Sequence, residues 1–350
     1  MKHGGDIYSN KVKMDFSVNL NPMGIPQEVA EATGQSLKRM MNYPDPRQDE
    51  VRNAIAEALR LESGCVYAGN GASELIMAAV RSVKPKRALL FEPGFSGYLH
   101  ALCAAGCNVD HHLLREENGF ALTQDDLSAL NRDIDLVIVC DPANPTGLNV
   151  EKEILEQLLK IAGRQHTTVI LDESFYLMSD QSLAQPMSTR HELLQKYDNV
   201  FLIRSLTKLF AVPGLRIGYV LSDTKNIEGL IRQLPEWNLS VVGEEAIIAG
   251  MKMLADTDYV SRSVRLIRAE REYLSRAFTQ MGLTVYESNC AYILLQGPQG
   301  LYEKLLKRGI LIRSCSDYMG LGQGYYRIAV KAHPENEILT EVMRGVMHEL

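Results

Sequence analysis

The sequence has no apolar run that approaches the roughly 20 residues needed to cross a bilayer. Its first residues, MKHGGDIYSNKVKMDF, lack the apolar segment of a secretory signal peptide. Cysteine is also sparse, with six residues at irregular spacing among 350. Without a secretion signal, such cysteines are typical of reduced thiols rather than of a disulfide framework. We therefore expect a cytoplasmic protein that has no membrane partner.

Basic residues are not in excess, since 37 Lys and Arg stand against 43 Asp and Glu, a formal net charge of -6. A protein that binds nucleic acid needs a basic surface, so no nucleic-acid partner is expected. Cys103 and Cys107 are followed closely by His111 and His112, but this spacing matches no common zinc site. We expect packed thiols on a helix there, and no metal.

Short apolar runs alternate with helical patterns from about residue 49 onward. The runs are rich in Val, Ile and Leu, which is typical of strands covered on both faces of a sheet. Such alternation favours a mainly parallel sheet, and therefore the α/β class. The expected strands are 87–91, 135–140, 168–172 and 199–203, and the expected helices are 49–60, 72–82 and 151–163.

The pattern changes after about residue 235, where a long helical stretch leads to shorter strands. This pattern of helices and strands predicts a smaller α+β domain at the C-terminus. Its expected elements are a helix over 259–281, strands at 291–296, 309–313 and 325–330, and a final helix from near Pro334. The first 30 residues are too turn-rich for a regular element. The predicted division is an N-terminal arm (1–30), a large domain (31–235) and a small domain (236–350).

Polar motifs follow the predicted strands at the sheet edge where ligands bind in open α/β folds. They are AGNGASE (68–74), EPGFSGY (92–98), DPANPTG (141–147), DES (172–174) and RSLTK (204–208). Each motif alone has an ordinary explanation as a turn, a helix cap or core. Together, however, they supply groups that suit a single ligand.

The first part of that ligand is a phosphate. A Gly-rich turn that runs into a helix, as at 68–74, offers backbone N–H groups and the positive end of the helix. Ser205 can add a hydroxyl group, and Arg216 a bidentate guanidinium. A phosphate site is therefore expected between these segments.

The second part is a flat ring that carries an aldehyde. Asp172, at the end of a buried strand, can keep a ring nitrogen protonated, and Phe95 can stack on the ring. Asn144 can bond a ring oxygen, while Lys208 can form an imine with the aldehyde. A phosphate, an aldehyde and a pyridine nitrogen describe pyridoxal phosphate (pyridoxal 5'-phosphate).

With these motifs in place, the chain resembles the fold-type I pyridoxal-phosphate enzymes over essentially its whole length. The branch that it resembles contains histidinol-phosphate aminotransferase and L-threonine-O-3-phosphate decarboxylase. The resemblance implies Lys208 as the Schiff-base lysine and Asp172 as the pyridinium partner. It also implies Phe95 as the stacking ring and Asn144 beside the phenolic oxygen of the cofactor. The residues implied around its phosphate are Gly71, Ala72, Ser73, Ser205 and Arg216.

The resemblance further implies a homodimer with shared active sites. Tyr43, in NYPDP, would reach the cofactor phosphate of the neighbouring subunit. The segments HGG, DFSVNLNPMGIP, GILIRSCSDYMGL and YYRIAV are similar to those of the decarboxylase. They place His3, Gly4, Asn21, Asn144, Arg313 and Arg327 at a small phosphorylated amino-acid substrate. Arg327 would clamp its carboxylate, whereas the residues that bind its phosphate stay open.

One position departs from the aminotransferases of this branch. They commonly carry Tyr three residues after the aspartate, where this chain has Phe175. Without that hydroxyl, the favoured reaction is decarboxylation of L-threonine O-3-phosphate to (R)-1-amino-2-propanol O-phosphate through an external aldimine, in cobalamin biosynthesis. The alternative is an aminotransferase of the histidinol-phosphate type, and phosphoserine stays open as a substrate. A non-catalytic regulator would need a helix-turn-helix module, which residues 1–48 do not resemble.

Overall fold

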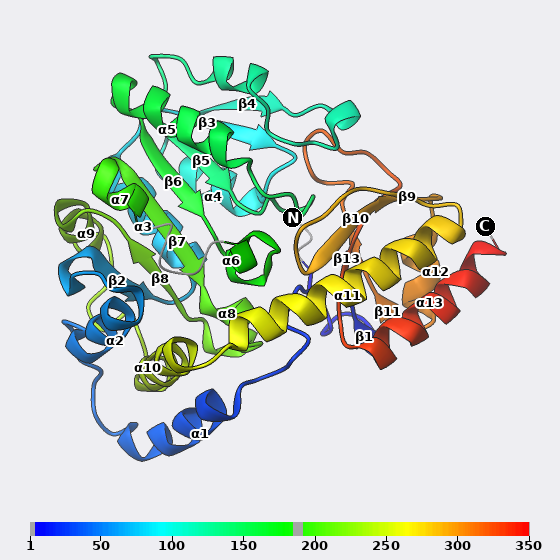
Figure 1. Ribbon diagram of the computed structural model, residues 1–350, viewed down its shortest axis with the longest axis horizontal. Coiled ribbons are helices and arrows are strands. Elements are labelled where there is room, and N and C mark those ends of the chain that lie inside the picture. Colours follow the sequence, from blue (N-terminus) through cyan, green and yellow to red (C-terminus); the bar gives the residue numbers. More distant parts are fainter. Residues whose placement is uncertain (1–3, 185–191, 350) are drawn as a thin grey trace.

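The computed structural model describes residues 4–184 and 192–349 of the chain. A seven-stranded sheet in the order β2-β8-β7-β6-β5-β3-β4 forms its larger part (Figure 1). β8 runs antiparallel to β2 and β7, while the other neighbours are parallel, so the expected mainly parallel α/β sheet is confirmed. The strands are β2 (Val66–Gly69), β3 (Arg87–Glu92), β4 (Asn108–Leu113), β5 (Leu136–Cys140), β6 (Thr168–Asp172), β7 (Val200–Ser205) and β8 (Gly218–Leu221).

Both faces of this sheet are covered, which is why its central strands are apolar at every position. Val137 and Val139 of β5 pack into one core, and Leu136 and Ile138 into the other. The first core contains side chains of α2 (Asp49–Leu59), α5 (Lys152–Gln165) and α10 (Val241–Asp256). The second contains side chains of α3 (Ala72–Val83), α4 (Ser96–Ala104) and α9 (Thr224–Ile231).

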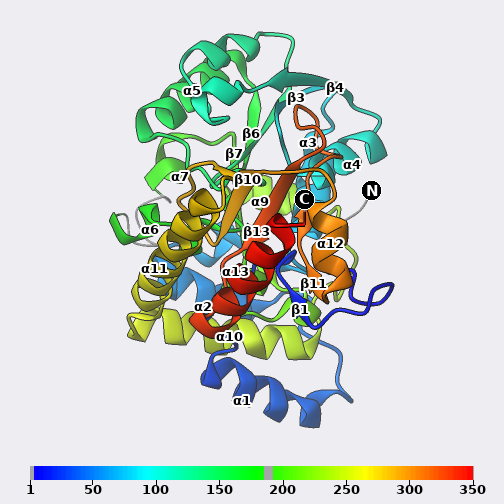
Figure 2. The same cartoon turned by 90° about the vertical axis from the view of Figure 1, so that its right-hand side faces the viewer.

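A second, antiparallel sheet has the order β12-β13-β10-β9, and α11 and α13 pack side by side over it (Figure 2). Its strands are β9 (Thr284–Val285), β10 (Tyr292–Gln296), β12 (Arg313–Ser314) and β13 (Tyr325–Ala329). Its helices are α11 (Tyr259–Gln280), α12 (Leu301–Lys307) and α13 (His333–Met347). This confirms a smaller α+β part. The boundary at 235 stays a prediction, and α10, which follows it, packs on α1 (Gln27–Ser36) and α2.

The N-terminal arm contains regular structure that its turn-rich sequence did not predict. A two-residue strand, β1 (Met14–Asp15), pairs in parallel with β11 (Ile310–Leu311), and α1 already begins at Gln27. The expected strand over 309–313 is likewise divided, because β11 pairs with the arm and β12 with β13. One apolar run thus pairs with two different strands, and the periodicity of the sequence does not indicate this.

The prediction for the cysteine and histidine segment was partly wrong. The helix α4 ends before Cys107, and only Cys107 is buried, whereas Cys103 is exposed. The histidines lie on the edge strand β4, where His111 pairs with Glu92 at 3.0 Å and His112 with Asp126 at 2.8 Å. In the part of the chain that the structure describes, no helix is long and apolar enough to span a membrane. The remaining helices are α6 (Gln181–Ala184), α7 (Glu192–Lys196) and α8 (Leu206–Leu209).

Candidate functional site

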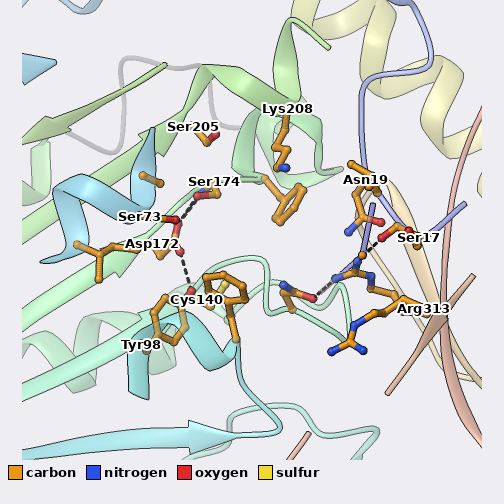
Figure 3. A pocket seen from close by; sticks show the side chains of 18 of the residues that line it. Ser17, Asn19, Ser73, Tyr98, Cys140, Asp172, Ser174, Ser205, Lys208 and Arg313 are labelled. Atoms are coloured by element: carbon orange, nitrogen blue, oxygen red, sulfur yellow. Dashed lines mark hydrogen bonds between the residues drawn. The ribbon is translucent and has the colours of Figure 1, made fainter. Parts of the chain in front are cut away.

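A cavity of about 450 Å³ lies where the carboxyl ends of β5, β6 and β7 meet the N-terminal arm and the second sheet (Figure 3). Lys208 points into it, between Asp172 on one side and Ser17 and Arg313 on the other. The predicted site residues that line the cavity are Gly4, Ala72, Ser73, Phe95, Asn144, Asp172, Ser205, Lys208, Arg216, Arg313 and Arg327.

Asp172 is the last residue of β6, and its carboxylate is buried against the cavity. Tyr98 Oη donates a hydrogen bond to Oδ2 at 2.6 Å, while Ser174 donates to Oδ1 from its backbone N at 2.9 Å and from its hydroxyl at 2.5 Å. Burial raises the pKa of Asp172, although the donors from Ser174 and Tyr98 oppose this shift. The site therefore holds a carboxylate that a protonated ring nitrogen would stabilise.

Lys208 lies on α8, the short helix that follows β7 directly. Burial, together with the positive charges of Arg216 and Arg327, lowers the pKa of its amine to about 8. Its amine forms no hydrogen bond or ion pair with any described residue. A lysine in this state is available as a nucleophile near neutral pH.

The start of α3 forms a cradle for an anion. Gly71 precedes the helix with φ +82°, and a Cβ there would lie 2.8 Å from Arg216 Nη2. The guanidinium of Arg216 therefore lies directly beside the Gly-rich turn, and the first turn of the helix has no side-chain cap. Ser73 and Arg216 are exposed in the single chain, so the cradle is open to the outside. Backbone N–H groups, a helix N-terminus and a guanidinium together suit a phosphate.

Arg327 is buried and lines the cavity from β13. Its Nη1 donates to Asn144 Oδ1 at 2.5 Å and its Nη2 to the carbonyl oxygen of Ser17 at 2.7 Å. Its Nε has no hydrogen-bond partner among the described residues. A guanidinium only donates, so the amide oxygen of Asn144 must face Arg327 and its NH₂ group faces away.

Arg313 differs from Arg327, because it has a carboxylate partner. Its Nη2 donates to both oxygens of Asp317, at 2.8 and 3.0 Å. The salt bridge that is the ordinary explanation for a buried arginine is thus present at Arg313. Among the residues that the structure describes, Arg327 has none.

Three of the predicted site residues that the structure describes do not line the cavity of the single chain. Tyr43 is 82% exposed and lies beside Trp237, with 5.0 Å between ring centroids. Asn21 is buried outside the cavity lining. Its Nδ2 donates hydrogen bonds to the Leu209 carbonyl and to Tyr259 Oη, at 3.0 and 3.1 Å. Gly71 belongs to the turn that forms the cradle but is not among the residues that line the cavity. His3 lies outside the described residues.

The sequence did not indicate several residues that do line the cavity: Ser17, Val18, Asn19, Ile76, Tyr98, Cys140, Ser174 and Tyr318. A signal existed for Tyr98, which lies in the first turn of α4, three residues after its N-cap residue Phe95. Asn19 Oδ1 is buried and, within the described chain, lacks a hydrogen-bond partner. No comparable signal marked Tyr318, because its position depends on how the second sheet packs.

The residues present fit pyridoxal phosphate. The open cradle suits a phosphate, Asp172 suits a pyridine nitrogen and the Asn144 amide suits a ring oxygen. The Lys208 amine, with its lowered pKa, suits an aldehyde. Four cationic side chains and one carboxylate are found among the described residues that line the cavity, so its charge also favours anionic ligands.

Comparison with known proteins supports this assignment. The sequence matches the aminotransferase class I and II family over residues 11–346. A threonine-phosphate decarboxylase of Salmonella typhimurium is 33% identical over 99% of this chain and 96% of its own length. A histidinol-phosphate aminotransferase of Pyrococcus furiosus is 30% identical over 95% of this chain and 91% of its own length.

Solved structures share the fold. The histidinol-phosphate aminotransferase of Clostridium acetobutylicum superposes with a TM-score of 0.87 at 28% identity, over 96% of this chain and 100% of that one. The L-threonine-O-3-phosphate decarboxylase of Porphyromonas gingivalis gives 0.81 at 20% identity, over 95% and 99%. The chain therefore belongs to the aminotransferase class I and II family, whose members are pyridoxal-phosphate-dependent enzymes of fold type I.

Proposed function

We propose that this enzyme is a carboxy-lyase that converts L-threonine O-3-phosphate into CO₂ and (R)-1-amino-2-propanol O-phosphate. The observation that carries the proposal is the second pair of cations in the cavity. Lys208 and Arg216 would bind the cofactor, which leaves Arg327 for one anionic group of the substrate and Arg313, which would share its guanidinium between Asp317 and the substrate, for the other. Two buried guanidinium groups suit a small molecule that has two anionic groups.

The cofactor contacts follow from the cradle and the strand ends. The Lys208 amine would hold the aldehyde carbon, Asp172 the pyridine nitrogen, Asn144 the ring oxygen, and Phe95 would stack on the ring. The residues that would hold the phosphate are Gly71, Ala72, Ser73, Ser205 and Arg216. When bound, pyridoxal phosphate supplies an electron sink that stabilises a carbanion at the Cα of the substrate.

The chain's own residues decide which bond at Cα breaks. Arg327 binds the carboxylate and Arg313 the phosphate, so the two together fix the rotation about Cα. Gly4 lies in the same wall, and His3 and Asn21 are further candidates for substrate contact. Lys208, with a pKa of about 8, is suited to return a proton to Cα after CO₂ leaves.

Phe175 favours decarboxylation over amino transfer. Its ring lines the cavity and packs edge-on against Tyr292, with 5.0 Å between centroids. It offers no hydroxyl to the ring oxygen of the cofactor, which leaves the Asn144 amide as donor. The similarity to the Salmonella typhimurium decarboxylase points the same way. The second candidate is histidinol-phosphate amino transfer, which the 30% identity to the Pyrococcus furiosus enzyme favours.

The assembly that we propose is a homodimer with shared sites. Met40, Met41 and Tyr43 are 63%, 98% and 82% exposed, next to Trp237 at 46%. An apolar cluster of this kind suits burial against a second copy of the chain. Tyr43 of one copy would then cover the open phosphate cradle of the other. Sedimentation equilibrium of the wild type against Met41→Glu tests this, and a wild-type monomer would contradict it.

Product analysis by mass spectrometry tests the reaction. Enzyme loaded with pyridoxal phosphate is mixed with L-threonine O-3-phosphate and no oxoacid, and Lys208→Ala serves as the control. Aminopropanol phosphate formed over many turnovers by the wild type alone would establish the lyase. No turnover, but amino transfer from histidinol phosphate to 2-oxoglutarate, would establish the aminotransferase instead.

A further inference from the structure

Two buried arginines stand directly opposite each other at the wall of the cavity. Arg313 of β12 and Arg327 of β13 are register partners in the antiparallel pair, and they are 7% and 6% exposed. Directly opposed residues project from the same face of a sheet, where like charges destabilise the pair. Since both side chains line the cavity, something must keep the two guanidinium groups apart and in place.

Hydrogen bonds hold the two groups in different directions. Arg327 is bound on the side of the large sheet and the arm, by Asn144 at 2.5 Å and by the Ser17 carbonyl at 2.7 Å. Arg313 is bound on the other side, by the Ser314 carbonyl at 2.6 Å and by Asp317 at 2.8 Å. The two cations therefore diverge from neighbouring strands.

Tyr318 contacts Arg313 and also Asn144, the residue that binds Arg327. The guanidinium of Arg313 lies over its ring, 5.2 Å from the centroid. The hydroxyl of the same ring donates to Asn144 Oδ1 at 3.4 Å, and this oxygen also accepts from Arg327. Tyr318 lines the cavity and is only 8% exposed. An aromatic ring has no internal rotation, so Tyr318 is a spacer that fixes the distance between the Arg313 guanidinium on its face and the Asn144 oxygen that binds Arg327.

We propose that Tyr318 is a specificity-determining residue, which sets the distance between the carboxylate and the phosphate that a substrate can carry. This inference rests on the proposed function, in which Arg327 and Arg313 bind those two groups. The ring supports Arg313 through a cation–π contact, while the hydroxyl ties the ring to the Asn144 and Arg327 side. A ligand that is longer by one methylene then meets one guanidinium out of place.

Calorimetric titration of the cofactor-loaded enzyme tests the spacer. The probes are 3-phosphooxypropanoate and its homologue 4-phosphooxybutanoate, which is longer by one methylene and, like the first, has no amino group to react. The wild type should prefer the shorter probe by about tenfold, because one misfitted methylene costs on the order of tenfold or more in a rigid site. Tyr318→Leu removes the ring and should reduce this preference to about threefold or less.

Three further variants keep the test decisive. Tyr318→Phe retains the ring but loses the hydroxyl bond to Asn144, so its preference should lie between those of the wild type and Tyr318→Leu. Tyr318→Trp is larger, displaces Arg313 outward and should favour the longer probe, so the test does not depend on the folding of Tyr318→Leu. Tyr325→Leu is the matched control: Tyr325 belongs to the same apolar cluster as Tyr318, but its hydroxyl bonds Glu116 at 2.8 Å and it does not line the cavity. It should behave as the wild type.

The outcomes separate this inference from the proposed function. If the wild type binds the shorter probe and Tyr318→Leu or Tyr318→Trp keeps the wild-type ratio, the spacer is refuted while the proposed function stands. If the wild type binds neither probe, both are refuted. A change of ratio in Tyr325→Leu equal to that in Tyr318→Leu would assign the effect to the apolar cluster, and would likewise overturn the inference.

Discussion

The lysine at the centre of the cavity should make the cofactor-free protein less stable at neutral pH than at alkaline pH. Folding lowers the pKa of Lys208 from 10.5 to about 8, through burial and then the charges of Arg216 and Arg327. Below pH 8 the amine is protonated in both the folded and the unfolded chain, so the full penalty is present. Between about pH 8 and 10.5 only the unfolded chain keeps the proton, and stability rises with pH.

The size of this penalty follows from the same values. A tenfold change in protonation corresponds to about 1.36 kcal/mol, so the lowered pKa of Lys208 costs about 3 kcal/mol. Lys208→Met keeps the side-chain length and removes the charge. Urea unfolding of the cofactor-free protein near pH 7 should therefore show this variant more stable by about 3 kcal/mol.

The difference in unfolding free energy should shrink as pH rises, and it should vanish near pH 10.5. Lys252→Met, at an exposed position on α10, is the matched control and should show no such trend. A stabilisation by Lys208→Met that stays constant between pH 7 and 10 would refute the reasoning, because it would reflect packing of the methionine and not the charge.

Three substitutions test other contacts. Tyr98→Phe removes the 2.6 Å hydrogen bond to the carboxylate that ends β6, and since such a bond is worth about 1.5–3 kcal/mol, spectroscopic titration should show cofactor binding weakened about tenfold or more. Gly71→Ala places a Cβ 2.8 Å from Arg216 Nη2, and should weaken cofactor binding far more than Gly24→Ala, which shares a positive φ but meets nothing within 4 Å. Equal effects of the two would assign the loss to backbone strain. Phe175→Tyr should raise the ratio of amino transfer to CO₂ release in product analysis. An unchanged ratio would show that Phe175 does not influence which reaction occurs.

The sequence predicted the parts of the fold whose signal is local. The runs that became β3, β5, β6 and β7 ended within two residues of their expected positions, because strands buried on both faces are continuously apolar. It missed β2, VYAG, which is only four residues long, and it missed β4 and β8 as well. β4, NVDHHL, is a polar edge strand, and β8, GYVL, is only four residues long and follows a turn.

The site residues show the same difference between local and long-range signals. Lys208, Asp172 and Arg216 stand at strand ends or turns within recognisable motifs, and all three reach the cavity. Tyr98 and Tyr318 contact partners 74 and 174 residues away in sequence, and no local pattern encodes such pairs. Long-range packing of the second sheet against the first is what the sequence alone leaves open.

The arm acts mechanically as a short tether between the two sheets. At one end β1 pairs with β11 beside the second sheet. At the other, Asn21 donates from its backbone N to the Lys208 carbonyl at 3.1 Å and from its side chain to the Leu209 carbonyl at 3.0 Å. A displacement of the second sheet would therefore pull directly on α8, the helix that carries the lysine.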